Sequence, residues 1–157
     1  MDHAVETTLT VNGAKVTRRI EPRQHLVDFL REELGLTGSH IGCEHGACGA
    51  CTVRVNGEIV RGCLMLAVQA NDCIVETIEG LSDSKELSKL QKAFHERNAL
   101  QCGFCTPGML MAAQELLLHK RSFSREEIRA HISGNYCRCT GYQSIVDAIE
   151  DVVNGKS

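Results

Sequence analysis

The sequence of 157 residues contains no tryptophan, and its aromatic residues make up only 4% of the chain. Proteins that stack single-stranded nucleic acids rely on aromatic side chains, so this composition argues against such a platform. The sequence also has no excess of positive charge, because its net charge is −3 and its isoelectric point is about 6.2. We therefore expect no nucleic-acid partner, since a polyanion is bound by a basic surface.

No apolar run approaches the roughly 20 residues that a transmembrane helix requires, so no membrane span is expected. The first residues, Met1 to Glu6, lack both the basic segment of an export signal and a twin-arginine pair. These two absences predict a cytoplasmic chain. Cysteine, by contrast, is abundant, with nine residues. An odd number of thiols in a reducing compartment argues against a disulfide framework and favours metal binding.

The first half of the chain predicts a small mixed β-sheet. Two Asn-Gly pairs, at 12–13 and 56–57, each separate runs that are rich in β-branched residues. This pattern is typical of β-hairpins, because both turn residues must adopt positive φ. Between the hairpins, apolar residues recur at helical spacing over 26–34 and stop at Gly35, and a last strand is expected at 73–78. We expect the helix to pack across the sheet.

The second half, after a break near residues 80–84, has the apolar spacing of four helices. The expected helix starts are Asp83 with Glu86, Thr106-Pro107, the capping box from Ser124 to Glu127, and Thr140-Gly141. The sequence therefore predicts a compact helical bundle in this half.

The first four cysteines have the spacing of a plant-type 2Fe-2S site. Four residues separate Cys43 from Cys48, two separate Cys48 from Cys51, and eleven separate Cys51 from Cys63. Two tetrahedral irons need four thiolates, and a glycine-rich loop brings backbone N–H groups close to the sulfur atoms. A zinc knuckle or simply buried thiols are the alternatives, which the spacing disfavours because zinc sites usually present two Cys-x2-Cys pairs.

A second group consists of Cys102, Cys105, Cys137 and Cys139. The spacing alone is equally compatible with zinc and with an iron–sulfur cluster. Each pair directly precedes an expected helix start, and the partial positive charge of a helix N-terminus favours an anionic cluster. Cys73 belongs to neither group, and we expect it to be a small buried side chain.

The residues around both groups resemble the iron–sulfur subunit of molybdenum hydroxylases, the xanthine oxidase family that includes carbon monoxide dehydrogenase. Three motifs carry the resemblance: 42–53 (GCEHGACGACTV), 101–108 (QCGFCTPG) and 134–142 (GNYCRCTGY). It extends from about Thr7 to Val153, which is nearly the whole chain. Tyr136 is a departure, since family members commonly carry an aliphatic residue there.

This resemblance implies an α+β fold in two domains. Residues 1–80 would form a β-grasp domain similar to plant ferredoxins, and residues 81–157 a C-terminal four-helix bundle. The chain would carry two 2Fe-2S clusters and no catalytic centre. The implied metal ligands are Cys43, Cys48, Cys51 and Cys63 for the first cluster, and Cys102, Cys105, Cys137 and Cys139 for the second.

The resemblance also implies partner subunits. Molybdopterin would be bound by a large subunit and FAD by a medium subunit, in a dimer of heterotrimers. Electrons would pass from molybdopterin through the second cluster and then the first to FAD. Gln101 and Cys139 would contact the pterin side of the molybdenum cofactor, whereas Arg61, close to the first group, is expected to affect mainly the flavin-side step.

Two other functions stay open on the sequence. A free-standing ferredoxin with two clusters would visit its partners transiently, but such carriers are often strongly acidic, and a net charge of −3 is mild. A structural zinc protein is the third possibility. The substrate is not encoded in this chain, because the residues that contact it would lie on the large subunit.

Overall fold

The computed structural model describes residues 3–82 and 88–155. The first half contains a five-stranded sheet in the order β2-β1-β5-β3-β4. Its strands are β1 (Val5–Val11), β2 (Ala14–Ile20), β3 (Thr52–Val55), β4 (Glu58–Arg61) and β5 (Ile74–Glu76). Strand β5 is parallel to β1 and antiparallel to β3. The sheet is therefore mixed, as the sequence predicts.

Both predicted hairpins are confirmed. Asn12 and Asn56 have φ values of 48° and 49°, and the glycines that follow them have φ values of 83° and 91°. Two successive residues with positive φ match the right-handed twist of the flanking antiparallel strands. The second hairpin, β3–β4, returns the chain to the cysteine loop that precedes it.

The helical segment between the hairpins packs on the sheet. It consists of α1 (Leu26–Asp28) and the π-helical turn η1 (Phe29–Glu33). Leu26, Phe29 and Leu30 are fully buried in one core with Leu9 and Val53 of the sheet. Two short 3-10 turns, η2 (Ala67–Ala70) and η3 (Ile78–Gly80), complete this half.

The second half consists of α2 (Lys89–Glu96), α3 (Thr106–Leu118), α4 (Arg125–Ile132) and α5 (Gln143–Val153), which share one apolar core. Proline stands in the first turn of α3, and Ser124 and Glu127 form the predicted capping box of α4. Ser88 caps α2 through the N–H of Gln91. The cap expected at Asp83 and Glu86 lies outside the described residues.

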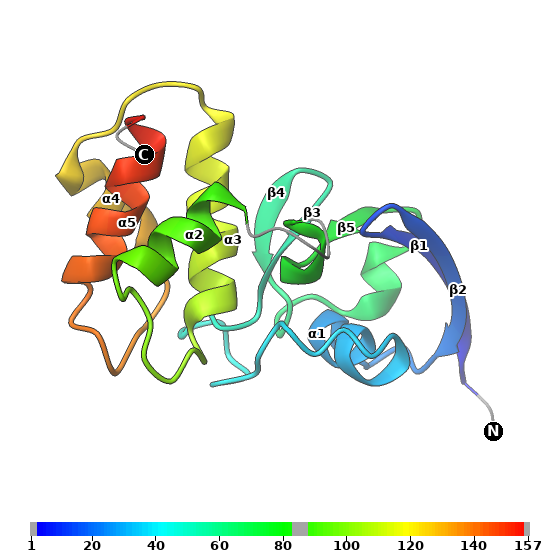
Figure 1. Cartoon of the computed structure of the whole chain (residues 1–157). Coiled ribbons are helices and arrows are strands. Elements are labelled where there is room, and N and C mark those ends of the chain that lie inside the picture. The colour runs from blue at the N-terminus through cyan, green and yellow to red at the C-terminus, as the bar shows by residue number, and fades with distance from the viewer. Residues whose placement is uncertain (1–2, 83–87, 156–157) are drawn as a thin grey trace.

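Helix α3 joins the two halves (Figure 1), because it stands between the other helices and strands β3 and β4. Seven of its residues are buried, from Gly108 to Leu116. A helix that is apolar on all sides is a core helix, and here one side is covered by the sheet. The mixed sheet and five α-helices establish the expected α+β class. Within the described part of the chain, no helix is both long and apolar enough to span a membrane.

Candidate metal centres

The first cysteine group lies on the loop between η1 and β3 and on the segment after β4. Pairing of β3 with β4 brings Cys63 back toward Cys51, and the N–H of Gly62 donates to the carbonyl of Cys51 at 3.1 Å. Cys51 and Cys63 are buried, with exposed fractions of 2% and 3%. Cys43 and Cys48 are half-buried, so this group has an inner pair and an outer pair.

Backbone N–H groups point at the outer sulfur atoms. The N–H of Cys48 donates to Cys43 Sγ at 3.4 Å, and the N–H of Ala50 donates to Cys48 Sγ at 3.5 Å. Backbone hydrogen bonds from Cys48 and His45 lower the pKa of the Cys43 thiol to about 6. Burial raises the pKa of Cys51 to about 11. The loop therefore stabilises negative charge on its outer sulfur, while the inner thiol needs a metal to become a thiolate.

Two glycines allow this loop to wrap closely. A Cβ atom on Gly42 would lie 2.9 Å from Cys48 Sγ. A Cβ atom on Gly46, where φ is +80°, would lie 2.4 Å from a methyl group of Leu64. A side chain at position 42 would therefore push against Cys48 Sγ, whereas at position 46 the positive φ is what favours glycine.

The second group comes from two segments of the helical half. Cys102 and Cys105 precede α3, and Cys137 and Cys139 lie on the loop between α4 and α5. Cys139 Sγ lies 3.5 Å from Cys102 Sγ, and both residues are exposed. Cys105 and Cys137, which are half-buried, form the inner pair.

The inner thiols of the second group have opposite pKa shifts. Burial raises the pKa of Cys105 to about 12, and its hydrogen bond with Cys137 adds to the effect. Burial opposes ionisation of Cys137 as well, but hydrogen bonds, led by that of Thr140, lower its pKa overall. The Thr140 hydroxyl donates to Cys137 Sγ at 3.1 Å. The Thr140 hydroxyl thus lowers the pKa of Cys137, as backbone N–H groups lower that of Cys43 in the first group.

The relation of this group to helix starts differs in part from the prediction. Cys105 is the residue immediately before α3, as expected, but α5 begins at Gln143, after a turn that follows Cys139. Tyr142 occupies the left-handed region with φ of 70°, and its hydroxyl accepts a hydrogen bond from the N–H of Cys137 at 2.8 Å. This folded-back tyrosine separates the second cysteine pair from the N-terminus of α5.

The thiols meet as pairs, which suits a dinuclear cluster. Hydrogen bonds link Cys43 with Cys48, Cys51 with Cys63, Cys102 with Cys139, and Cys105 with Cys137. Across residues 3–82 and 88–155, no three His, Cys, Asp or Glu side chains converge as on a single metal ion. A 2Fe-2S cluster has two irons, each of which takes two protein thiolates, so two adjacent pairs fit it better than they fit one zinc ion.

Three further residues singled out in the sequence have defined contacts: Gln101, Cys73 and Arg61. Gln101 is exposed, and its Nε2 donates to the carbonyl of Cys139 at 2.9 Å. Cys73 is half-buried against the sheet core rather than fully buried, and its sulfur accepts from Asn56 Nδ2 at 3.3 Å. Arg61, which was predicted to lie close to the first group, also donates to the carbonyl of Gly134 in the second half.

Sequence reasoning missed Asn135, although it lies within a recognised motif. Its side chain is 3% exposed and donates to the carbonyl of Gly49, 86 positions earlier. A contact between residues so far apart leaves no local signal in a single sequence. The roles of Thr140 and Tyr142 were missed because they depend on how the loop folds back.

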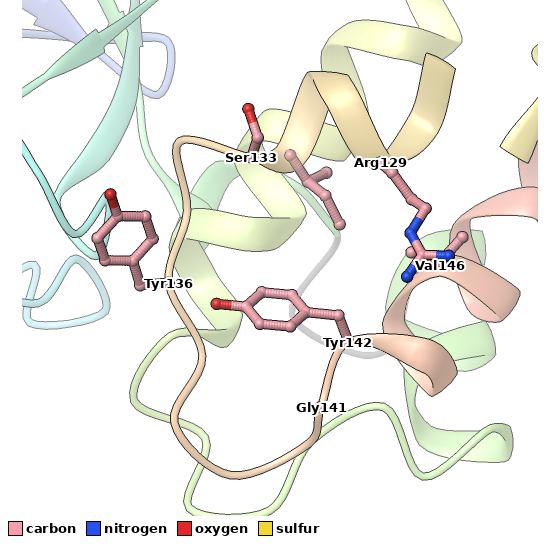
Figure 2. Close-up of a pocket in the computed structure, with 7 residues that line it drawn as sticks. Arg129, Ser133, Tyr136, Gly141, Tyr142 and Val146 are labelled. Atoms are coloured by element: carbon pink, nitrogen blue, oxygen red, sulfur yellow. The ribbon is translucent and has the colours of Figure 1, made fainter. Parts of the chain in front are cut away.

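A cavity of about 270 Å³ lies beside the loop that carries Cys137 and Cys139 (Figure 2). Arg129 reaches it from α4, Ser133 from the position just after α4, and Tyr136 and Tyr142 from the loop that carries Cys137 and Cys139. Tyr136 has an exposed fraction of 58%. The departure from the family pattern at Tyr136 therefore places a phenol ring on the surface of this cavity.

Comparisons with known proteins agree with this geometry. A family model described as a 2Fe-2S iron-sulfur cluster binding domain matches residues 9–72, and one described as a 2Fe-2S binding domain matches residues 77–150. The caffeine dehydrogenase subunit gamma of Pseudomonas sp. (strain CBB1) is 55% identical over 92% of this chain and 89% of its own length. The nicotine 6-hydroxylase small subunit of Paenarthrobacter nicotinovorans is 51% identical over 94% of this chain and 88% of its own.

Solved structures extend the comparison to the fold. The crystal structure of quinoline 2-oxidoreductase from Pseudomonas putida 86 contains a chain that is 49% identical, with a TM-score of 0.94, over 98% of this chain and 95% of that one. The aldehyde oxidoreductase of Desulfovibrio gigas matches 98% of this chain with a TM-score of 0.89, but only 18% of its own longer chain. The protein is thus of the two-cluster 2Fe-2S class, and it belongs to the family of iron–sulfur small subunits of molybdenum hydroxylases.

Proposed function

We propose that this chain is the electron-transfer subunit of a molybdenum-dependent hydroxylase or dehydrogenase complex. It takes electrons from a molybdopterin centre on a large subunit and passes them toward FAD on a medium subunit. The observation that carries the proposal is the gathering of eight thiols into two groups, each built of two adjacent pairs. Family membership supplies the context of a multi-subunit oxidoreductase.

The proposed ligands are Cys43, Cys48, Cys51 and Cys63 for one 2Fe-2S cluster, and Cys102, Cys105, Cys137 and Cys139 for the other. When bound, each cluster supplies a centre that gains and loses one electron. The chain's own groups hold the thiolates and stabilise their charge through backbone N–H donors in the first group and the Thr140 hydroxyl in the second. Such donors to sulfur raise a cluster's tendency to accept an electron.

The two groups would face different partners. In the second group the Cys102 and Cys139 pair is exposed, and Gln101 lies against the Cys139 carbonyl. We place the pterin of the molybdenum cofactor at this edge, because an amide can donate to and accept from a pterin. In the first group the loop between the outer cysteines, Cys43 and Cys48, lies at Gly46 beside exposed Leu64, and we place the flavin subunit there.

The finer organisation belongs to the same proposal. We divide the chain into a β-grasp ferredoxin-like domain over residues 1–80 and a four-helix bundle over residues 81–157. We further propose assembly as a dimer of heterotrimers in the cytoplasm. The aldehyde oxidoreductase of Megalodesulfovibrio gigas supports a subunit over a free carrier, because the segment matching this chain is only 17% of one long polypeptide.

Purification of the tagged chain from its native host tests this function. We expect it to elute with two larger chains, one carrying molybdenum and one carrying FAD, and to contain iron and acid-labile sulfide with two distinct reduced-state EPR signals. Elution of the chain alone with both clusters would support the free carrier instead. Zinc in place of iron would support the structural zinc protein.

A further inference from the structure

A polar seam joins the two halves of the chain between the two cysteine groups. We define the seam as Gly49, Thr52, Arg61, Gly134 and Asn135. The first three belong to the sheet half and the last two to the loop after α4. Asn135 and Thr52 are buried, with exposed fractions of 3% and 1%. The large majority of polar side chains this deep are hydrogen-bonded.

The seam's side chains are hydrogen-bonded to one another and to backbone carbonyls of both halves. Asn135 Nδ2 donates to the Gly49 carbonyl at 3.0 Å and to Thr52 Oγ1 at 3.3 Å. Arg61 Nη2 donates to the Gly134 carbonyl at 2.8 Å and reaches Asn135 Oδ1 at 3.5 Å. Its Nη1 donates to the Thr52 hydroxyl, which in turn donates to the Gly49 carbonyl. The guanidinium fork thus spans both halves in one fixed geometry.

The backbones at the seam approach so closely that only glycine fits. A Cβ atom on Gly49 would lie 2.6 Å from the Gly134 carbonyl oxygen. A Cβ atom on Gly108, in the first turn of α3, would lie 2.2 Å from the Gly49 carbonyl oxygen. These are contacts with rigid backbone, so the two halves have little freedom to slide past each other.

The seam also lies next to the proposed ligands of both clusters in the sequence. Gly49 stands between Cys48 and Cys51, and Arg61 precedes Cys63 by two positions. Asn135 precedes Cys137 by two positions, and the intervening Tyr136 donates its N–H to the Cys48 carbonyl at 2.8 Å. The seam therefore ties the backbone of one cysteine group to the backbone of the other.

We propose that Asn135 and Arg61 are positioning residues that fix the separation and relative orientation of the two clusters. The inference rests on the proposed function, because it concerns the transfer of electrons between those clusters. Transfer between two centres falls steeply as they move apart, so a subunit gains from holding them at one distance. If the seam only held the two halves together, substitutions in it would change stability and leave the magnetic interaction between the clusters unchanged.

The test uses the purified complex with Asn135→Ala or Arg61→Lys. Asn135→Ala removes the amide that binds Gly49 and Thr52, and Arg61→Lys keeps the charge but loses the two-pronged geometry. The matched control is Asn154→Ala. The side-chain amide of Asn154 also makes two hydrogen bonds, both with the backbone of Phe123 within the helical half. The readout is low-temperature EPR of the fully reduced complex, in which two nearby paramagnetic clusters split and relax each other according to distance and orientation.

We expect both seam variants to keep their iron and the individual cluster signals but to show a reduced or broadened mutual splitting. The control should match the wild type. An identical interaction in wild type and both seam variants, including none at all, overturns the inference, as does an equal change in Asn154→Ala. If Asn135→Ala does not assemble, Arg61→Lys decides. A wild-type complex with no iron–sulfur signals would instead overturn the proposed function.

Discussion

The two cysteine groups solve one chemical task with different local structures. The first is a glycine-rich loop folded over a hairpin, with N–H groups aimed at its outer sulfur atoms. The second draws two pairs from separate segments around α3, with the Thr140 hydroxyl as a donor. In the first the inner pair is deeply buried, whereas in the second the outer pair is fully at the surface. We therefore expect electrons from a partner to enter at the second group.

Replacing one proposed ligand in each group gives the largest expected effect. Cys51→Ser should abolish the first cluster signal and also destabilise the sheet half, because Cys51 is buried beside Cys63. Cys102→Ser should abolish only the second signal. Because Cys102 is exposed, this variant should not be destabilised as Cys51→Ser is. Iron content, EPR and urea unfolding measure these effects. Loss of both signals from either variant would contradict the assignment of two separate groups.

Gln101→Ala tests the exposed edge of the second group. Both clusters should assemble, while reduction by substrate slows or the molybdenum content of the complex falls, because the amide beside Cys139 is lost. Rapid-freeze EPR after mixing with substrate measures the early step. Gln143→Ala, an exposed glutamine at the start of α5, is the matched control and should behave as wild type. Wild-type transfer and molybdenum content in Gln101→Ala would remove the pterin contact from the proposal.

In the metal-free protein the cysteines differ in the pKa of their thiols. With a pKa of about 6, Cys43 is mostly thiolate near pH 7, whereas Cys51 and Cys105, with pKa values of about 11 and about 12, stay protonated. Iodoacetamide should therefore modify Cys43 well before the other two, as peptide mapping would report. The lowered pKa of Cys43 also adds stability above the ordinary thiol pKa of about 8.5, which is lost as the pH falls through about 6. Equal labelling rates would contradict the loop's effect on Cys43.

The smallest expected effect is that of Cys73→Ser. Cys73 contacts Asn56 and packs at the edge of the sheet core. A hydroxyl can accept the same hydrogen bond, so we expect both EPR signals to persist. The free energy of unfolding should change by no more than about 0.5 kcal/mol. Disappearance of one signal would show that a cysteine group was assigned wrongly.

What the sequence predicted correctly was encoded locally. The two Asn-Gly turns, the capping box at Ser124 and the proline in the first turn of α3 act over a few residues, and each is confirmed. The cysteine spacing predicted two groups of thiols, and the fold places Cys102 beside Cys139 and Cys51 beside Cys63, while their role as cluster ligands stays a prediction.

What the sequence did not predict depends on long-range contacts or on loop conformation. The partners of the Asn135 side chain lie 86, 83 and 74 positions away, so no local pattern marks it. The later start of α5 follows from Tyr142, which adopts positive φ and turns its hydroxyl back to Cys137. An aromatic residue is rare in that backbone region, so propensity alone would not place it there.

Helix α3 has a consequence for how the protein unfolds. Its buried surface is shared between the helical core and the sheet half, and its first turn meets the Gly49 carbonyl. Opening of the sheet half alone would leave the side of α3 that contacts β3 and β4 exposed to water, at a cost in free energy. The two halves should therefore lose structure in a single cooperative transition. The amides in the middle of α3 should then exchange with solvent only when the whole chain opens.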